Sequence, residues 1–232
     1  MTNHIQTTST LETSVLKSLR SLMPVRELTY DEALTRAELQ ATRLLELHQT
    51  YKAPVPIEMV TELPRIRVER IYDLPTSGSA HWDGGNWVLS INAGEYSLRQ
   101  KFSVMHEFKH VLDHPTKHLL KVEKGQKLTV DEMHEKIADY FAACVLMPRK
   151  LVKDAYCNQR IQGIEALADM FQVSQKAMSF RLGQLGLSMP VERCLPSLST
   201  RTYQPSTDRR ARSSLGVQRY YRSLPTPEGV LI

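Results

Sequence analysis

Five consecutive residues, His106-Glu107-Phe108-Lys109-His110, constrain the fold of this chain more than any other feature. In an α-helix, side chains four residues apart lie on one face, so His106 and His110 can offer two imidazoles to a single metal ion. Glu107 can then reach a water molecule activated by that ion and accept its proton. The run therefore predicts a helix that carries an H-E-x-x-H metal site.

The sequence around the motif supports a helix. Ser97-Leu-Arg-Gln100 fits a capping box at the start, and Pro115 provides a stop. The chain has eight histidines, so the motif alone could arise by chance. Its position inside a capped segment with an apolar stripe strengthens the interpretation as a metal site.

A catalytic zinc site needs a third protein ligand. His114 is one candidate, but the helix rises about 12 Å from His106 to His114, and ligand atoms must lie about 2 Å from the ion. We therefore expect His114 to lie at the helix end, where it can support a ligand but does not bind the metal itself. The longer metzincin pattern also fails, because Asp113 and Thr116 stand where it requires Gly and His.

Glu135, on the next predicted helix, is the better third ligand. It falls in register with the apolar positions of that helix, where a buried carboxylate is costly unless it is paired or bound to metal. Asp139 follows four residues later on the same face. In gluzincin-type zinc peptidases, an E-x-x-x-D pair supplies the third ligand and a carboxylate that orients a ligand histidine. The alternative is that Glu135 pairs with Lys109 or another cation and that Asp139 is solvated.

Periodicity and turn signals predict an α+β chain that is mainly helical and contains a small antiparallel sheet. Capping boxes at Thr29–Glu32 and Thr129–Glu132 mark two of the helix starts. The expected helices are Tyr30–His48, Ile57–Glu62, the motif helix from Ser97, the helix that follows Thr129, Ile161–Phe171 and Ser174–Leu185. The expected strands are Ile66–Ile71, a segment from Ser77 and Trp87–Asn92, with a hairpin turn at Asp83–Asn86.

Charge and cysteine content indicate the compartment and the partners. The formal net charge is +5, and residues 188–232 carry +4 of it through seven arginines against three acidic residues. Three cysteines without a C-x-x-C pair predict neither disulfides nor a cysteine zinc site, and Cys144 is expected in the core. No apolar run approaches the roughly 20 residues of a membrane span, and the N-terminus is polar. We therefore expect a cytoplasmic protein without a membrane partner.

Two stretches resemble the ImmA/IrrE family of metallo-endopeptidases. They are residues 100–110, which contain the motif, and residues 135–148, which end in Phe-Ala-Ala-x-x-Leu-Met-Pro. The resemblance covers roughly residues 30–187. It implies that zinc is held by His106, His110 and Glu135, with Glu107 as the catalytic base. Ligand type alone does not separate zinc from manganese or iron.

The resemblance also implies a protein substrate. Members of this family cleave a helix-turn-helix repressor of a prophage, a mobile element or a stress response. Lys109 departs from the family, which has Gly there; we expect it to face solvent, with carboxylate pairing or substrate contact as alternatives. Further candidates for stabilising an oxyanion are His134, Tyr140 and Lys109.

The chain is expected to consist of four segments. They are a flexible N-terminal segment (1–28), a zincin-like metallopeptidase domain (29–150), a helix-turn-helix-like helical module (151–187) and a disordered tail rich in Arg, Ser and Pro (188–232).

The competing interpretation is a DNA-binding regulator with a non-catalytic metal site. The spacing from Leu167 to Leu182 is that of a helix-turn-helix. However, Gln172 replaces the usual turn glycine, and the second helix offers only Lys176 and Arg181 as cations, whereas a DNA-reading helix usually brings more. We therefore favour a docking or packing module, and a solvated tail over a tail that contacts nucleic acid.

Overall fold

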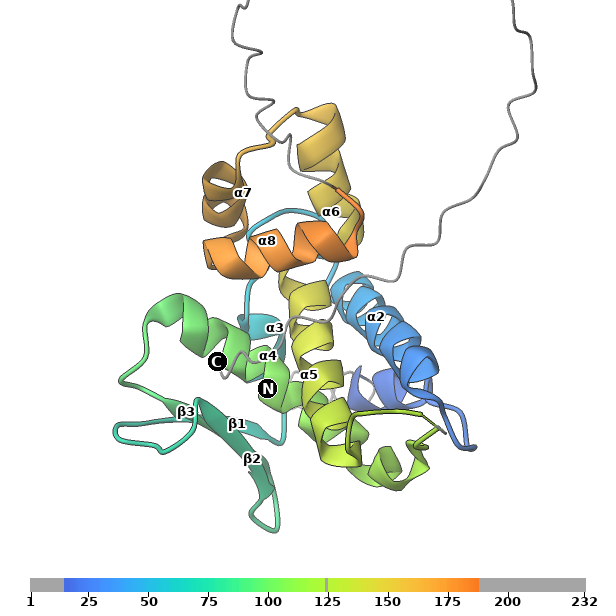
Figure 1. Cartoon of the computed structure of the whole chain (residues 1–232). Helices are drawn as coiled ribbons and strands as arrows, with labels where there is room; N and C mark the ends of the chain where they lie inside the picture. The colour runs from blue at the N-terminus through green and yellow to red at the C-terminus, as the bar shows by residue number, and fades with distance from the viewer. Residues whose placement is uncertain (1–14, 124, 188–232) are drawn as a thin grey trace, which may run out of the picture. The chain divides into compact units, whose positions relative to one another are not determined.

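A computed structural model describes residues 15–123 and 125–187 (Figure 1). The fold is α+β, with a small three-stranded sheet beside a mainly helical core. No helix in these two stretches has the length and apolarity that crossing a membrane requires.

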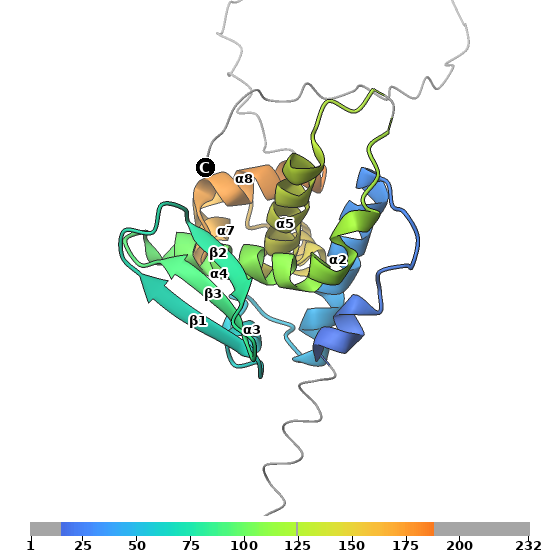
Figure 2. The ribbon, with the colours of Figure 1, turned by 90° about the horizontal axis from the view of Figure 1, so that it is seen from below.

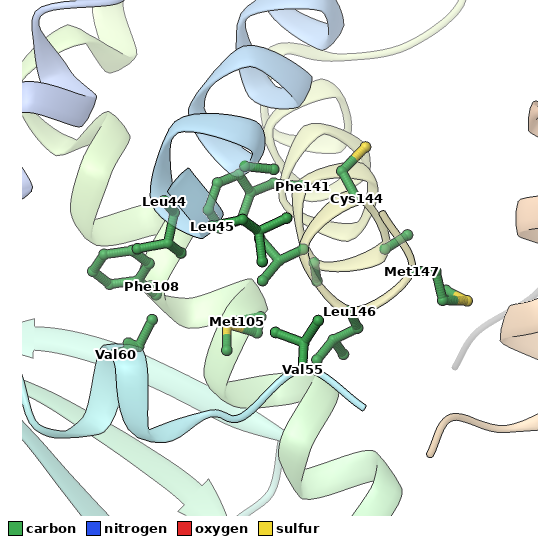
Figure 3. Packing of buried hydrophobic residues seen from close by; sticks show 14 of the residues in the cluster. Leu44, Leu45, Val55, Val60, Met105, Phe108, Phe141, Cys144, Leu146 and Met147 are labelled. Atoms are coloured by element: carbon green, nitrogen blue, oxygen red, sulfur yellow. The ribbon is translucent and has the colours of Figure 1, made fainter. Parts of the chain in front are cut away.

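Three long helices form the core. The helix α5 (Val130–Leu146) packs against both α2 (Tyr30–Leu47) and α4 (Ser97–Asp113). Three alanines on the buried face of α2, at 33, 37 and 41, leave little side-chain volume between the helices. Leu44, Phe108 and Phe141 meet in the interior (Figure 3). Cys144 is buried as predicted, and burial raises the pKa of its thiol to about 11.

The predicted capping boxes of α2 and α5 are confirmed. The hydroxyl oxygen of Thr29 accepts a hydrogen bond from the Glu32 N–H, and Glu32 accepts one from the Thr29 N–H; Thr129 and Glu132 repeat the arrangement. The capping box predicted for α4 is wrong. Its N-cap is Tyr96, and Gln100 instead donates its amide to the carbonyl oxygen of Glu95 at 2.7 Å.

The sheet contains β1 (Ile66–Ile71), β2 (Gly78–Trp82) and β3 (Trp87–Asn92) in the order β1-β3-β2. The predicted hairpin is present: β2 and β3 are antiparallel, and Asp83 Oδ1 accepts the N–H groups of Gly85 and Asn86 in the turn. β1, however, runs parallel to β3, so the prediction of an entirely antiparallel sheet is wrong. The strands alternate in direction along the chain, and the hairpin inserts β3 between β1 and β2.

Shorter helices complete the fold: α3 (Glu58–Thr61), the 3-10 helix η1 (His114–Leu119), α6 (Arg149–Lys153), the π-helix η2 (Asp154–Asn158), α7 (Ile164–Phe171) and α8 (Gln175–Gln184). α7 and α8 contact each other. Between them Gln172 takes the left-handed conformation (φ 51°) that glycine usually supplies in such a turn. Gly186, at φ +67°, follows the end of α8.

Residues 15–28 are packed, which differs from the expectation of a flexible segment at 1–28. Leu19 is fully buried, and its carbonyl oxygen accepts a hydrogen bond from Gln40 at 3.1 Å. Leu28 pairs with the segment after η1, because its N–H donates to Leu119 and its carbonyl oxygen accepts from Lys121. Residues 1–14 and the expected tail at 188–232 lie outside the described residues.

Candidate metal centre

Two helices bring the predicted ligands together. α4 carries His106 and His110 one turn apart, and α5 packs beside it with Glu135. The Nε2 atoms of the two histidines are 3.1 Å apart. Glu135 Oε2 lies 3.2 Å from Nε2 of His106, and its Oε1 lies 3.4 Å from Nε2 of His110. The sequence prediction placed these three residues at one site, and the structure places their ligand atoms within 4.8 Å of one another.

This spacing fits a small metal ion. Ligand atoms about 2 Å from a tetrahedral ion lie about 3.3 Å from one another, and the three separations above bracket that value. Two histidines and a carboxylate are also the donor set of catalytic zinc sites that keep a fourth position open. The side chain of Glu135 is 62% exposed, so the cluster is accessible from solvent.

Asp139 orients one ligand. Its Oδ1 lies 2.8 Å from Nδ1 of His106, and because an ionised carboxylate only accepts, the ring nitrogen donates. Nε2 of His106 is thereby directed toward His110 and Glu135. Burial lowers the pKa of His106, but the hydrogen bonds to Asp139 and Glu135 outweigh it and raise the pKa to about 9. The hydrogen bonds from His106 and His110 hold the pKa of Glu135 well below its usual range.

Glu107 lies beside the cluster and is almost completely buried. Burial raises its pKa, while the nearby rings of His106 and His110 oppose the shift. It packs against Gly78 of β2, where an added Cβ would lie 2.8 Å from Oε1 and 2.9 Å from Cγ of Glu107. Sequence reasoning missed Gly78, although the glycine at the start of the second predicted strand was a signal of close approach.

Glu135 is exposed, so the prediction that its carboxylate points into an apolar interior is wrong. It lies near the start of α5, whereas the buried residues that pack in the core, Ala138, Ala142 and Val145, lie further along the helix. The carboxylate therefore reaches the histidines from the solvent side.

Lys109 is buried, which overturns the expectation that it faces solvent. Its Nζ donates to Asp113 Oδ1 at 2.5 Å and to Gln40 Oε1 at 2.8 Å. Burial lowers the pKa of Lys109, and Asp113 opposes that shift. The lysine thus pairs with a carboxylate, but with Asp113 on its own helix and not with Glu135.

The other candidates near the motif have different partners. Nε2 of His134 lies 3.1 Å from the Lys117 carbonyl oxygen, and the Tyr140 hydroxyl donates to Glu38 at 3.0 Å. The burial of Lys109 and the hydrogen bond of Tyr140 to Glu38 argue against these two residues as groups that stabilise an oxyanion. His134 stays a candidate, because this contact engages only one of its ring nitrogens. His114 stands outside the cluster, with its ring edge-on to Trp87 at 4.9 Å.

The α+β fold and the cluster of two histidines and a glutamate on adjacent helices define the class of a zincin-like metallopeptidase domain. A family model, Peptidase M78, described as the IrrE N-terminal-like domain, matches residues 65–183, just over half of the chain. The protein belongs to this family.

A solved structure, described as a Mycobacterium tuberculosis transcriptional regulator, is similar at 16% sequence identity and a TM-score of 0.48. The similarity covers 73% of this chain and 51% of that one, so this chain spans about half the length of the regulator. No curated protein matches the chain at a significant level.

Proposed function

We propose that the protein is a cytoplasmic, zinc-dependent endopeptidase that cleaves a regulatory protein, namely a helix-turn-helix repressor of a prophage, a mobile element or a stress response. The observation that carries the proposal is the convergence of His106, His110 and Glu135 beside a buried Glu107. A purely structural metal site has no need of such a carboxylate. Membership of the Peptidase M78 family supports the same reaction class.

Each residue has a distinct role in this reaction. His106, His110 and Glu135 would hold the metal, and Asp139 fixes the ring of His106 through its Nδ1. A zinc ion bound there would supply Lewis acidity toward the peptide carbonyl and the attacking water. Glu107 takes a proton from that water and later gives it to the leaving amine.

The exposed edge of β2 favours cleavage within a peptide chain over removal of terminal residues. β2 is an edge strand among those described, so its outer backbone groups can pair with an extended peptide. Gly78 of β2 touches Glu107, so a peptide added to this edge passes the metal centre with chain continuing on both sides.

The DNA-binding alternative is weakened by α8. Arg181, one of the two cations expected to contact phosphate, is 1% exposed, and its Nε donates to the Met147 carbonyl oxygen at 3.1 Å. Only Lys176 remains exposed of that pair. The contact of Arg181 with the end of α5 supports a packing role for residues 151–187.

The test is to examine the neighbouring genes for a helix-turn-helix repressor and to incubate the full-length protein and zinc with its purified product. We expect wild type to cleave, and Glu107→Gln to be slower by about 100-fold or more. Glu165→Gln, an exposed change on α7, is the matched control and keeps full activity. Equal cleavage by wild type and Glu107→Gln contradicts the mechanism. No cleavage by wild type, together with binding to operator DNA, favours the regulator.

A further inference from the structure

Three aromatic rings form a continuous group at the end of the hairpin, which we call the aromatic ledge: Trp82, Trp87 and His114. Trp82 and Trp87 face each other across the last pair of β2 and β3, with ring centroids 5.6 Å apart. Trp87 contacts the ring of His114, the residue that caps the end of α4. Trp82 is nevertheless 45% exposed, which is unusual for so large an apolar side chain.

The aromatic ledge lies further along the same two elements, β2 and α4, that contribute residues to the metal centre. Side chains alternate along a strand, so Trp82 lies on the same face of β2 as Gly78, the residue that touches Glu107. Four residues of strand separate them by about 13 Å. On α4, His114 lies one turn, about 6 Å, beyond His110. Figure 2 shows the sheet packed alongside α4, and both β2 and β3 contact this helix.

The two carboxylates next to the aromatic ledge, Asp83 and Asp113, are already paired with cations of this chain. Asp83 pairs with Arg67 at 3.2 Å and accepts two backbone N–H groups in the hairpin turn. Asp113 pairs with the buried Lys109. A cationic side chain on the ledge would therefore meet no free carboxylate from these neighbours, whereas an apolar side chain would cover the exposed part of Trp82.

We propose that the aromatic ledge is a specificity subsite that binds a large apolar or aromatic side chain of a peptide lying along the β2 edge. The inference rests on the proposed peptidase function and adds a residue preference on one side of the cleaved bond. The alternative is that the tryptophan pair only closes the hairpin as a cross-strand contact.

The first test measures cleavage preference. Full-length, zinc-loaded wild type and Trp82→Thr are incubated with a mixture of synthetic peptides of randomised sequence, and the products are sequenced by mass spectrometry. We expect wild type to prefer Phe, Trp or Leu at one position on one side of the cut, and Trp82→Thr to reduce that preference about fivefold or more. Tyr72→Thr, which removes a 75% exposed aromatic residue after β1, is the matched control and should keep the same cleavage preference as wild type.

Trp82→Thr keeps a strand-forming residue, and circular dichroism reports whether the sheet is retained. His114→Ala provides a second variant that leaves both tryptophans in place. It also reduces the preference if the ledge binds substrate. An unchanged preference in both variants overturns the subsite.

The second test needs no turnover. The chain has two tryptophans, and both lie in the ledge, so their fluorescence reports binding there directly. Zinc-loaded Glu107→Gln is titrated with a synthetic peptide that contains one Phe and with its Phe→Asp counterpart. A saturable emission change with the Phe peptide alone supports the subsite, even if wild type cleaves nothing and the proposed function fails. Cleavage without any emission change or preference leaves the peptidase function standing and shows that the pair only closes the hairpin.

Discussion

Gly78 and Glu107 are in direct contact, and the contact depends on the absence of a side chain at residue 78. A Cβ there would lie 2.8 Å from Glu107 Oε1, closer than such atoms approach without displacement. The edge strand thus holds the proposed base in place, although 28 residues separate the two in sequence.

Gly78→Ala is therefore expected to displace Glu107 while leaving the metal ligands intact. A shift of the base by about 1 Å can reduce the cleavage rate about 100-fold. The measurement is the rate of repressor or peptide cleavage, together with the zinc content of the purified protein. Gly183→Ala, where a Cβ meets nothing within 4 Å, is the control and keeps the rate. A normal rate in Gly78→Ala would show that the position of Glu107 does not limit the reaction.

Asp139→Ala is expected to weaken zinc binding. Without the carboxylate, Nδ1 of His106 loses its partner, and the orientation of Nε2 toward the cluster is no longer fixed. Removal of such a supporting group costs about 10- to 100-fold in metal affinity. Competition with a chromogenic chelator above pH 9, where the proton on His106 no longer competes with zinc in either protein, measures the loss. Asp169→Ala on the exposed surface of α7 is the control. Unchanged affinity would mean that Asp139 is merely a solvated carboxylate.

The parts of this centre that the sequence predicted are those with a local pattern. Histidines four residues apart in H-E-x-x-H, and Glu135 four residues before Asp139, each specify one face of one helix. Two capping boxes fixed where α2 and α5 begin. Because these contacts join residues only three or four positions apart, the spacing of the residues in the sequence is enough to predict them.

The parts that were missed depend on contacts between distant segments. The burial of Lys109 requires Gln40, which lies 69 residues away on α2. The turn residues predict only that β2 and β3 are antiparallel. They do not predict whether β2 or β3 pairs with β1, and the parallel sheet contact arises because β3 does. The contact of Gly78 with Glu107 likewise forms only when the sheet packs on α4.

Zinc affinity is expected to depend on pH through His106. In the metal-free protein its pKa is raised to about 9, so the ring is protonated at neutral pH, and a metal ion must displace that proton. The apparent affinity should therefore fall about tenfold for each unit that the pH falls below 9, and it should level off above that value. Chelator competition across this range measures the slope. In Asp139→Ala, which removes a hydrogen bond that raises the pKa, the plateau should begin at lower pH; a pH-independent affinity contradicts the assignment.

Lys109 is expected to contribute to stability and not to the reaction. Lys109→Met leaves Asp113 as an unpaired charge with a side chain only 12% exposed, and breaking a buried pair in this way costs about 3–5 kcal/mol in the free energy of unfolding. Urea denaturation measures the loss. The double variant Lys109→Met/Asp113→Leu removes both charges and should recover most of the stability, because the cost comes from the orphaned carboxylate. Exposed Lys136→Met on α5 is the control. If Lys109→Met instead keeps its stability but loses cleavage, the lysine acts on the substrate in a conformation other than the one described.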